Sequence, residues 1–192
     1  HVFGVAAGAE ARVVAEFLGQ FVADARTTHH QDHLFAQAFG FDAEPAVAAL
    51  YRWSAGRLDR MAGGISVSNG LAFSPDGQTM YLSDSHPNRQ TVWLFDYDPE
   101  TGTPSDRRVF IDFKPLPGRP DGAAVDADGG LWNAQWDGSC LVRYAADGQE
   151  TQRITLPVSR PTCPAFGGPD LGDLYLTTAR IGLDAGALER QP

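Results

Sequence analysis

The sequence predicts an all-β fold after residue 45: a β-propeller of about three blades, preceded by a helical N-terminal segment. Two observations support this prediction. Short segments of alternating apolar and polar residues are separated by Asp-Gly, Pro-Gly and Gly-Gly pairs, a pattern typical of short strands joined by tight turns. Two sequence patterns also alternate along the chain, and their repeat of roughly 40 to 50 residues is the length of a four-stranded propeller blade.

The first pattern supplies an inner strand, a tight turn and a second strand. It reads NGLAFSPDGQTMYLSD from Asn69, PDGAAVDADGGLWNAQ from Pro120 and, more loosely, PTCPAFGGPDLGDLYLTTA from Pro161. The second pattern supplies a further strand, and it reads ALYRWSAGR, TVWLFDYDPETG and CLVRYAADGQ. Closed propellers need about four to eight blades, so we expect a partial or open ring from a chain with about three.

A change in composition separates an atypical N-terminal segment, residues 1–45, from the partial propeller at residues 46–192. No proline precedes Pro45 and no tryptophan precedes Trp53, whereas four of the five histidines lie within the first 33 residues. Apolar residues at helical spacing across residues 9–25 predict an amphipathic helix. We therefore expect the segment to be helical or unrelated to the repeats.

Composition restricts the class of partner. The 192 residues carry a formal net charge of -9, with a pI near 4.8, whereas nucleic acids and anionic membranes attract concentrated Lys and Arg. No apolar stretch approaches the ~18 residues that a membrane-spanning helix requires. We expect neither nucleic acid nor a membrane as partner, and a neutral small molecule suits the charge.

The cysteines and the start of the chain bear on the compartment. Cys140 and Cys163 are too few for a disulfide scaffold and lack C-x-x-C spacing, so we expect two buried free thiols. The chain begins with His1 and contains no basic stretch followed by an apolar core, so no signal peptide is predicted. We expect a cytoplasmic protein and a truncated chain, whose open sheet edges favour self-association.

Asn69 and Asp121 occupy equivalent positions in two successive repeats. Inner strands of a propeller begin beside the central channel, so both side chains are expected to converge there. An amide oxygen and a carboxylate suit Ca²⁺, Mg²⁺ or Mn²⁺ and also accept Zn²⁺. The alternative is structural, because Asn-Gly and Pro-Asp-Gly are common turn formers. The residues alone leave both interpretations open.

A resemblance to a known family is carried by four segments: ISVSNGLAFSPDGQTMYLSDS, WLFDYDPETG, RPDGAAVDADGGLWNA and PTCPAFGGPDLGDLYLTTAR. From about Ala49 to its end, the chain resembles the gluconolactonase and regucalcin family, also called the senescence marker protein family. The resemblance implies a six-bladed propeller, here incomplete, with a divalent ion at the channel mouth. The family's ligands are a glutamate near the N-terminus, the asparagine of S-N-G-L and the aspartate of P-D-G. The last two correspond to Asn69 and Asp121.

The resemblance also implies an activity, because enzymes of this family open sugar lactones to aldonic acids. Asn69 would offer its carbonyl oxygen to the ion, and Gly70 would let the backbone pass close to it. Asp121 would hold the ion and accept the proton of the attacking water as a general base. The predicted function is metal-dependent hydrolysis of a sugar lactone, in a truncated form. The alternative is a noncatalytic calcium-binding or structural propeller remnant.

Other polar residues are candidates for the same site. Glu10 lies on the predicted helix at the wrong distance from Asn69, so the third ligand is unassigned. The THHQDH stretch resembles a zinc motif of metallo-β-lactamase-like hydrolases but lacks the preceding strand, so we expect a polar loop or helix end. His86 faces either the channel or the surface. Arg119, beside Asp121, either orients a substrate oxygen or is simply exposed.

Overall fold

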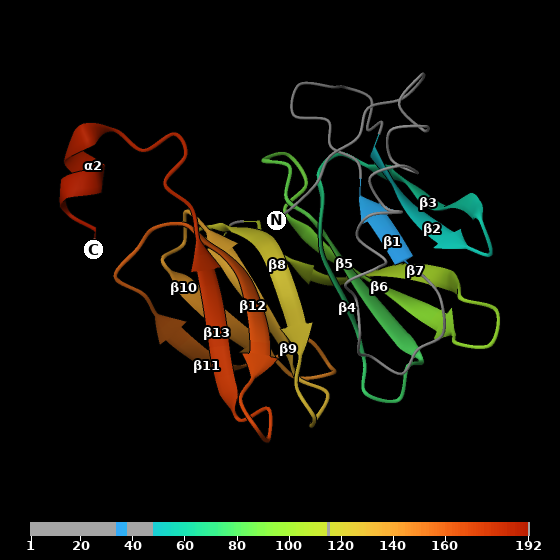
Figure 1. Ribbon diagram of the computed structural model, residues 1–192. Coiled ribbons are helices and arrows are strands. Elements are labelled where there is room, and N and C mark those ends of the chain that lie inside the picture. The colour runs from blue at the N-terminus through green and yellow to red at the C-terminus, as the bar shows by residue number, and fades with distance from the viewer. Residues whose placement is uncertain (1–33, 38–47, 115, 192) are drawn as a thin grey trace. The chain divides into compact units, whose positions relative to one another are not determined.

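A computed structural model describes residues 34–37, 48–114 and 116–191, and these residues confirm the all-β class (Figure 1). The chain divides into two compact units, residues 1–68 and residues 69–192, which are described separately. The predicted helix at residues 9–25, Glu10 and the THHQDH stretch lie outside the described residues. The proposed boundary near residue 45 therefore stays a prediction. None of the described helices has the length and hydropathy of a membrane span.

The first unit contains one antiparallel sheet of three strands. They are β1 (Leu34–Gln37), β2 (Ala48–Ser54) and β3 (Arg57–Ile65), in the order β1-β2-β3. Ala55 and Gly56 connect β2 to β3, and both have positive φ angles, 48° and 76°. Two successive positive φ angles belong to the hairpin turns that match strand twist. Strand β1 shows that the segment before residue 45 contributes to a sheet.

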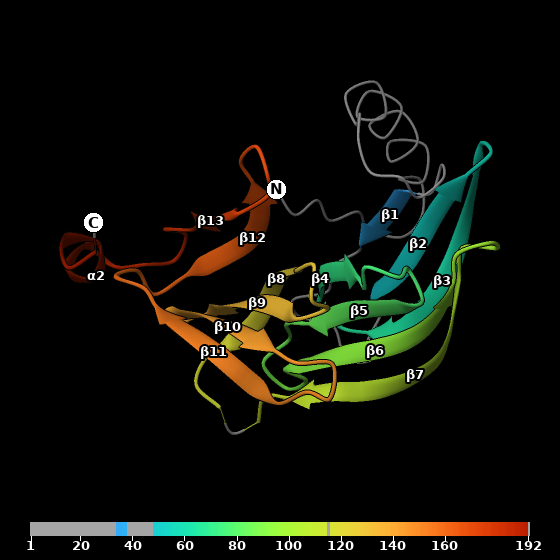
Figure 2. The same ribbon diagram turned by 90° about the horizontal axis from the view of Figure 1, so that it is seen from below.

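The second unit contains two four-stranded sheets, each with its strands in chain order (Figure 2). The first is formed by β4 (Ser68–Phe73), β5 (Thr79–Asp84), β6 (Thr91–Asp98) and β7 (Thr103–Asp112). The second is formed by β8 (Arg119–Val125), β9 (Leu131–Trp136), β10 (Cys140–Tyr144) and β11 (Glu150–Thr155). Each sheet is therefore the four-stranded meander of a propeller blade, which the sequence repeats predicted.

A smaller sheet and a short helix complete the second unit. Strands β12 (Pro161–Gly167) and β13 (Asp173–Thr178) form an antiparallel pair, and α2 (Ala185–Glu189) follows. Cys140 is buried as expected, but Cys163 on β12 is exposed, so the prediction of two buried thiols was wrong. Cys163 lies between the paired residues Pro161 and Pro164, where the register of β12 against β13 is irregular, and it is absent from the apolar cluster that joins this sheet to the second sheet.

The sheets of the second unit pack face to face through alternating side chains. One cluster joins residues of the first sheet, such as Tyr81 and Val92, to Leu131 and Val142 of the second. The opposite face of the second sheet packs Trp132, Ala134 and Leu141 against Phe166, Leu174 and Leu176 of the last sheet. Adjacent residues thus point to opposite faces, as the strand period of two requires. This stacking places β8 of the second sheet beside β5 of the first.

Candidate functional site

The two residues singled out from the repeats meet in the structure. Asn69 lies on β4 and Asp121 on β8, 52 residues apart, and they are 7% and 5% exposed. The Asn69 Nδ2 atom donates a hydrogen bond to Asp121 Oδ1. The Asn69 Oδ1 atom accepts one from the Gly70 N–H at 3.0 Å. The predicted convergence of these side chains is therefore present, while their role as ligands stays a prediction.

Gly70 is required by this close approach. Its φ angle is +48°, in the left-handed region, and a Cβ added to it would meet the Asp121 carbonyl oxygen and the side chain of Ser83. Asn69 and Gly70 lie within β4, just as Asp121 and Gly122 lie within β8. Neither pair forms a turn between strands, so the turn-forming alternative is wrong for both.

Burial controls the charge of Asp121. Removal from water raises the pKa of this carboxyl from 3.8 to about 7, although the hydrogen bond from Asn69 and the positive charge of Arg119 act to lower it. The hydrogen-bond partner is a neutral amide, which compensates a buried negative charge only in part. A carboxylate that is almost fully buried and has a raised pKa is suited either to transferring protons near neutral pH or to binding a cation.

Sequence reasoning missed a set of buried polar residues around Asp121. Asn133 and Gln135 on β9 and Ser83 on β5 are at most 2% exposed. Asn133 Nδ2 contacts the backbone oxygens of Asp121 and Gly122 at 3.3 and 3.2 Å. The signal was present in LWNAQ, where two polar residues interrupt an apolar strand at alternate positions.

His86 follows the end of β5, and Arg119 is the first residue of β8, two positions before Asp121. His86 is only 8% exposed, and its Nδ1 accepts a hydrogen bond from the Asn88 N–H at 3.2 Å, so its side chain is buried although residues 87–89 of its loop are exposed. The neighbouring Ser85 Oγ donates to the Pro120 carbonyl oxygen. The Arg119 side chain is 27% exposed and pairs with Asp137 at 3.5 Å, so it is not free in solvent.

The side chains of Asn69 and Asp121 would provide part of the ligand shell of a divalent cation. A carboxylate and an amide oxygen are hard ligands, and the incompletely compensated charge of Asp121 favours a cation beside it. Among residues 34–37, 48–114 and 116–191, no group of three or more His, Cys, Asp or Glu side chains could hold a metal ion. Asn69 and Asp121 are the two ligands with an assignment, and the third ligand expected from the resemblance has none among the described residues.

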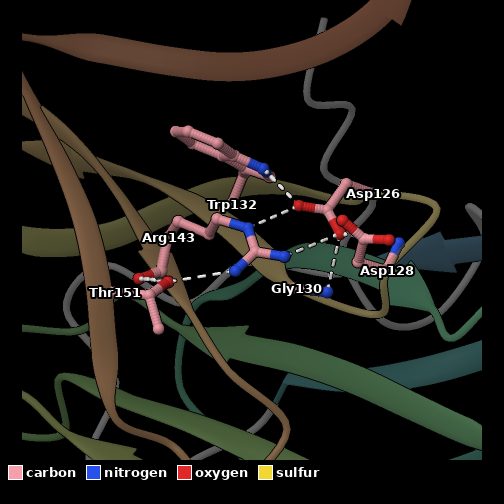
Figure 3. A network of polar contacts seen from close by, with 6 residues as sticks. All are labelled: Asp126, Asp128, Gly130, Trp132, Arg143 and Thr151. Carbon is pink, nitrogen blue, oxygen red and sulfur yellow. Dashed lines mark hydrogen bonds and ion pairs between the residues drawn. The ribbon is translucent and has the colours of Figure 1, made fainter.

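The DADGGLW stretch has a structural role at the other end of the β8–β9 hairpin (Figure 3). Asp126 Oδ1 accepts hydrogen bonds from the Gly130 and Asp128 N–H groups at 2.8 and 3.1 Å, which confirms the predicted turn function. Its Oδ2 accepts from Trp132 Nε1 at 2.8 Å and from Arg143 Nε at 2.6 Å. Burial acts to raise the pKa of Asp126, but these donors outweigh it and the pKa is lowered.

Comparisons with known proteins agree on one family. The chain matches the family described as SMP-30/Gluconolactonase/LRE-like region over residues 23–180. It is 44% identical to the L-arabinolactonase of Azospirillum brasilense over 78% of this chain and 50% of that protein. It is 39% identical to the regucalcin of Danio rerio over 82% of this chain and 54% of that protein.

A solved structure shows the same architecture. The calcium-binding protein regucalcin of Agrobacterium tumefaciens superposes with a TM-score of 0.79 at 35% sequence identity, covering 85% of this chain and 55% of that one. The chain spans about half the length of the relatives it matches. The match begins at residue 23, within the segment that composition set apart from the repeats.

Proposed function

Because the chain belongs to the SMP-30/gluconolactonase/LRE-like family, we propose that it hydrolyses a sugar lactone to the aldonic acid with the help of a divalent metal ion. Membership confirms the resemblance read from the motifs. The observation that carries the proposal is the buried pair of Asn69 and Asp121, which joins the first strands of two adjacent sheets. The lactonases among the relatives support a sugar lactone as the substrate class.

Asn69 and Asp121 would hold the ion, which we propose to be Ca²⁺, Mg²⁺, Mn²⁺ or Zn²⁺. When bound, such an ion polarises the carbonyl of an ester and makes a nearby water more acidic. Asn69 now presents its amide nitrogen to Asp121. It would have to turn this amide to offer Oδ1 instead, and the Gly70 N–H would then need another acceptor.

Asp121 would transfer protons during ring opening. Burial raises the pKa of Asp121 to about 7 in the protein without a metal ion, and a bound cation would lower it and keep the carboxylate ionised to accept a proton. Water attacks the lactone carbonyl carbon and gives a proton to the Asp121 carboxylate. The bond between that carbon and the ring oxygen then breaks, and the proton passes to the departing oxygen, which yields the open-chain acid. No nucleophilic serine or cysteine takes part.

A noncatalytic calcium-binding role is the second candidate. It is favoured by the structural neighbour, which is described as a calcium-binding protein. Calorimetric titration with Ca²⁺ separates the two: binding without turnover supports this role, whereas binding with turnover supports the hydrolase.

The test of the hydrolase is turnover of gluconolactone and arabinolactone by the purified chain, measured by acid release with EDTA and with each metal restored. We expect metal-dependent turnover that Asp121→Ala abolishes. Asp126→Asn is the matched control, because Asp126 lies on the same hairpin away from Asn69. Unchanged metal-dependent turnover in Asp121→Ala would show that the assignment is wrong.

We also propose the cytoplasm as the location and a neutral sugar lactone as the small-molecule partner, with neither nucleic acid nor a membrane as partner. The support is the presence of two free thiols, which reducing compartments preserve, and the net charge of -9. Self-association is a further proposal. In the described part of the chain, β13 pairs with β12 alone, so its second edge offers backbone hydrogen bonds to another copy.

A further inference from the structure

Asp121 lies in a β-bulge, which is the feature that directs its side chain. Strand β8 pairs with β9 through Pro120 and Gln135, and the next pair along the ladder is Ala123 with Asn133. Two residues of β8, Asp121 and Gly122, therefore stand opposite a single residue of β9. A bulge of this kind leaves backbone groups outside the regular ladder and changes the direction of the bulged side chain.

The side chain of Asn133 replaces the missing ladder contacts. Its Nδ2 atom lies 3.3 Å from the Asp121 carbonyl oxygen and 3.2 Å from the Gly122 carbonyl oxygen. It also lies 3.4 Å from Ser83 Oγ, which belongs to the neighbouring sheet. Asn133 is fully buried, so no water competes for these acceptors at its position.

The orientation of the Asn133 amide is determined by its neighbours. Backbone carbonyls only accept hydrogen bonds, so the nitrogen must face Asp121 and Gly122. The Asn133 Oδ1 atom faces the other way and accepts from Gln135 Nε2 at 2.6 Å. Gln135 is itself 2% exposed, and the amide pair is therefore held in a single arrangement.

The bulge has little room to relax in other directions. On one side, a Cβ at Gly70 would meet the Asp121 carbonyl oxygen. On the other side, a Cβ at Gly122 would lie 2.5 Å from the Thr162 carbonyl oxygen and 2.7 Å from the Cys163 Cα. The backbone of Asp121 and Gly122 is thus packed between β4 and β12, and Asn133 supplies its hydrogen bonds.

We propose that Asn133 is a positioning residue that holds the bulge so that the Asp121 carboxylate meets the Asn69 amide. The expected effect of Asn133 on turnover rests on the proposed function. Its expected effect on the contact between Asn69 and Asp121 does not. Replacing Asn133 should disturb the contact between Asn69 and Asp121 in the protein without metal. It should also weaken metal binding and slow the chemical step more than it changes substrate binding.

The experiment compares Asn133→Leu, which keeps the size but removes the donor, with Asp126→Asn, which weakens the far end of the same hairpin. In metal-free protein, the side-chain amide resonances of Asn69 are followed by ¹⁵N NMR. We expect Asn133→Leu to move them toward the shifts of an unbonded amide and Asp126→Asn to leave them in place. Should Asn133→Leu prevent folding, Asn133→Ser is measured in the same way.

Metal affinity and kinetics provide the second arm. We expect Asn133→Leu to weaken Ca²⁺ binding on the order of 10- to 100-fold by calorimetry, as for other residues that orient ligands. The turnover number kcat should fall on the same order while KM changes by less than about threefold. Unchanged Asn69 resonances, or equal losses in both variants, would overturn the proposal. Absence of turnover in the unmodified chain contradicts the proposed hydrolase alone, because the NMR arm still tests the bulge.

Discussion

Replacing Asp121 by asparagine should stabilise the protein above neutral pH. The folded state raises the pKa of Asp121 from 3.8 to about 7, because the carboxylate is buried against a neutral amide. Between these two pKa values the folded state keeps a proton on Asp121 that the unfolded chain has released. The contribution of Asp121 to the free energy of unfolding is therefore fully present below about pH 4 and is lost as the pH rises through 7. The loss corresponds to about 4 kcal/mol when both states are fully ionised.

The variant Asp121→Asn has no charge to bury, and its side-chain oxygen can still accept the hydrogen bond from Asn69. We therefore expect its free energy of unfolding to match that of the unmodified protein near pH 4 and to exceed it by up to about 4 kcal/mol at pH 8. Urea denaturation in EDTA at intervals of one pH unit measures this difference. A difference that does not change with pH, or a less stable variant at pH 8, would refute the reasoning.

Four further predictions follow from particular contacts. Gly70→Ala should lower the free energy of unfolding in urea more than Gly129→Ala does, because both glycines have positive φ but only a Cβ at Gly70 would meet other atoms. Equal losses in the two variants would contradict this. Asp126→Asn should lower the free energy of unfolding by about 1–3 kcal/mol at pH 7. This loss should shrink as the pH falls through the lowered pKa of Asp126. A loss that persists at pH 2 would count against the ion pair with Arg143. Leu131→Ala, at a fully buried position, should cost about 2–5 kcal/mol by thermal or urea unfolding, and a cost below 1 kcal/mol would argue against the inter-sheet core. Tyr175→Lys, on exposed β13, should reduce self-association in sedimentation velocity, and an unchanged oligomer distribution would place the contact elsewhere.

Repetition explains how much of the site was predictable. Asn69 and Asp121 stand at the same position of two repeated units, and stacking of similar sheets brings such positions together whatever the details of packing. The Asp-Gly turns and the alternation of apolar residues likewise depend on local geometry. These features therefore followed from the order of residues alone.

Other features depend on contacts between distant residues. Asn133 acquires its role from a one-residue shift between β8 and β9, and no local pattern states where a ladder shifts. The exposure of Cys163 depends on an irregular register between β12 and β13. The burial of His86 depends on packing around a loop that looked polar in the sequence. In each case the deciding partner is far away in the chain.

The most direct test of a shared ion is a crystal structure of the chain soaked in Mn²⁺, with the ion located by its anomalous scattering. We predict one peak within bonding distance of both the Asn69 amide oxygen and the Asp121 carboxylate, and loss of that peak in Asp121→Ala. A structure at saturating Mn²⁺ in which the Asn69 nitrogen still donates to Asp121, with no peak beside them, would contradict it.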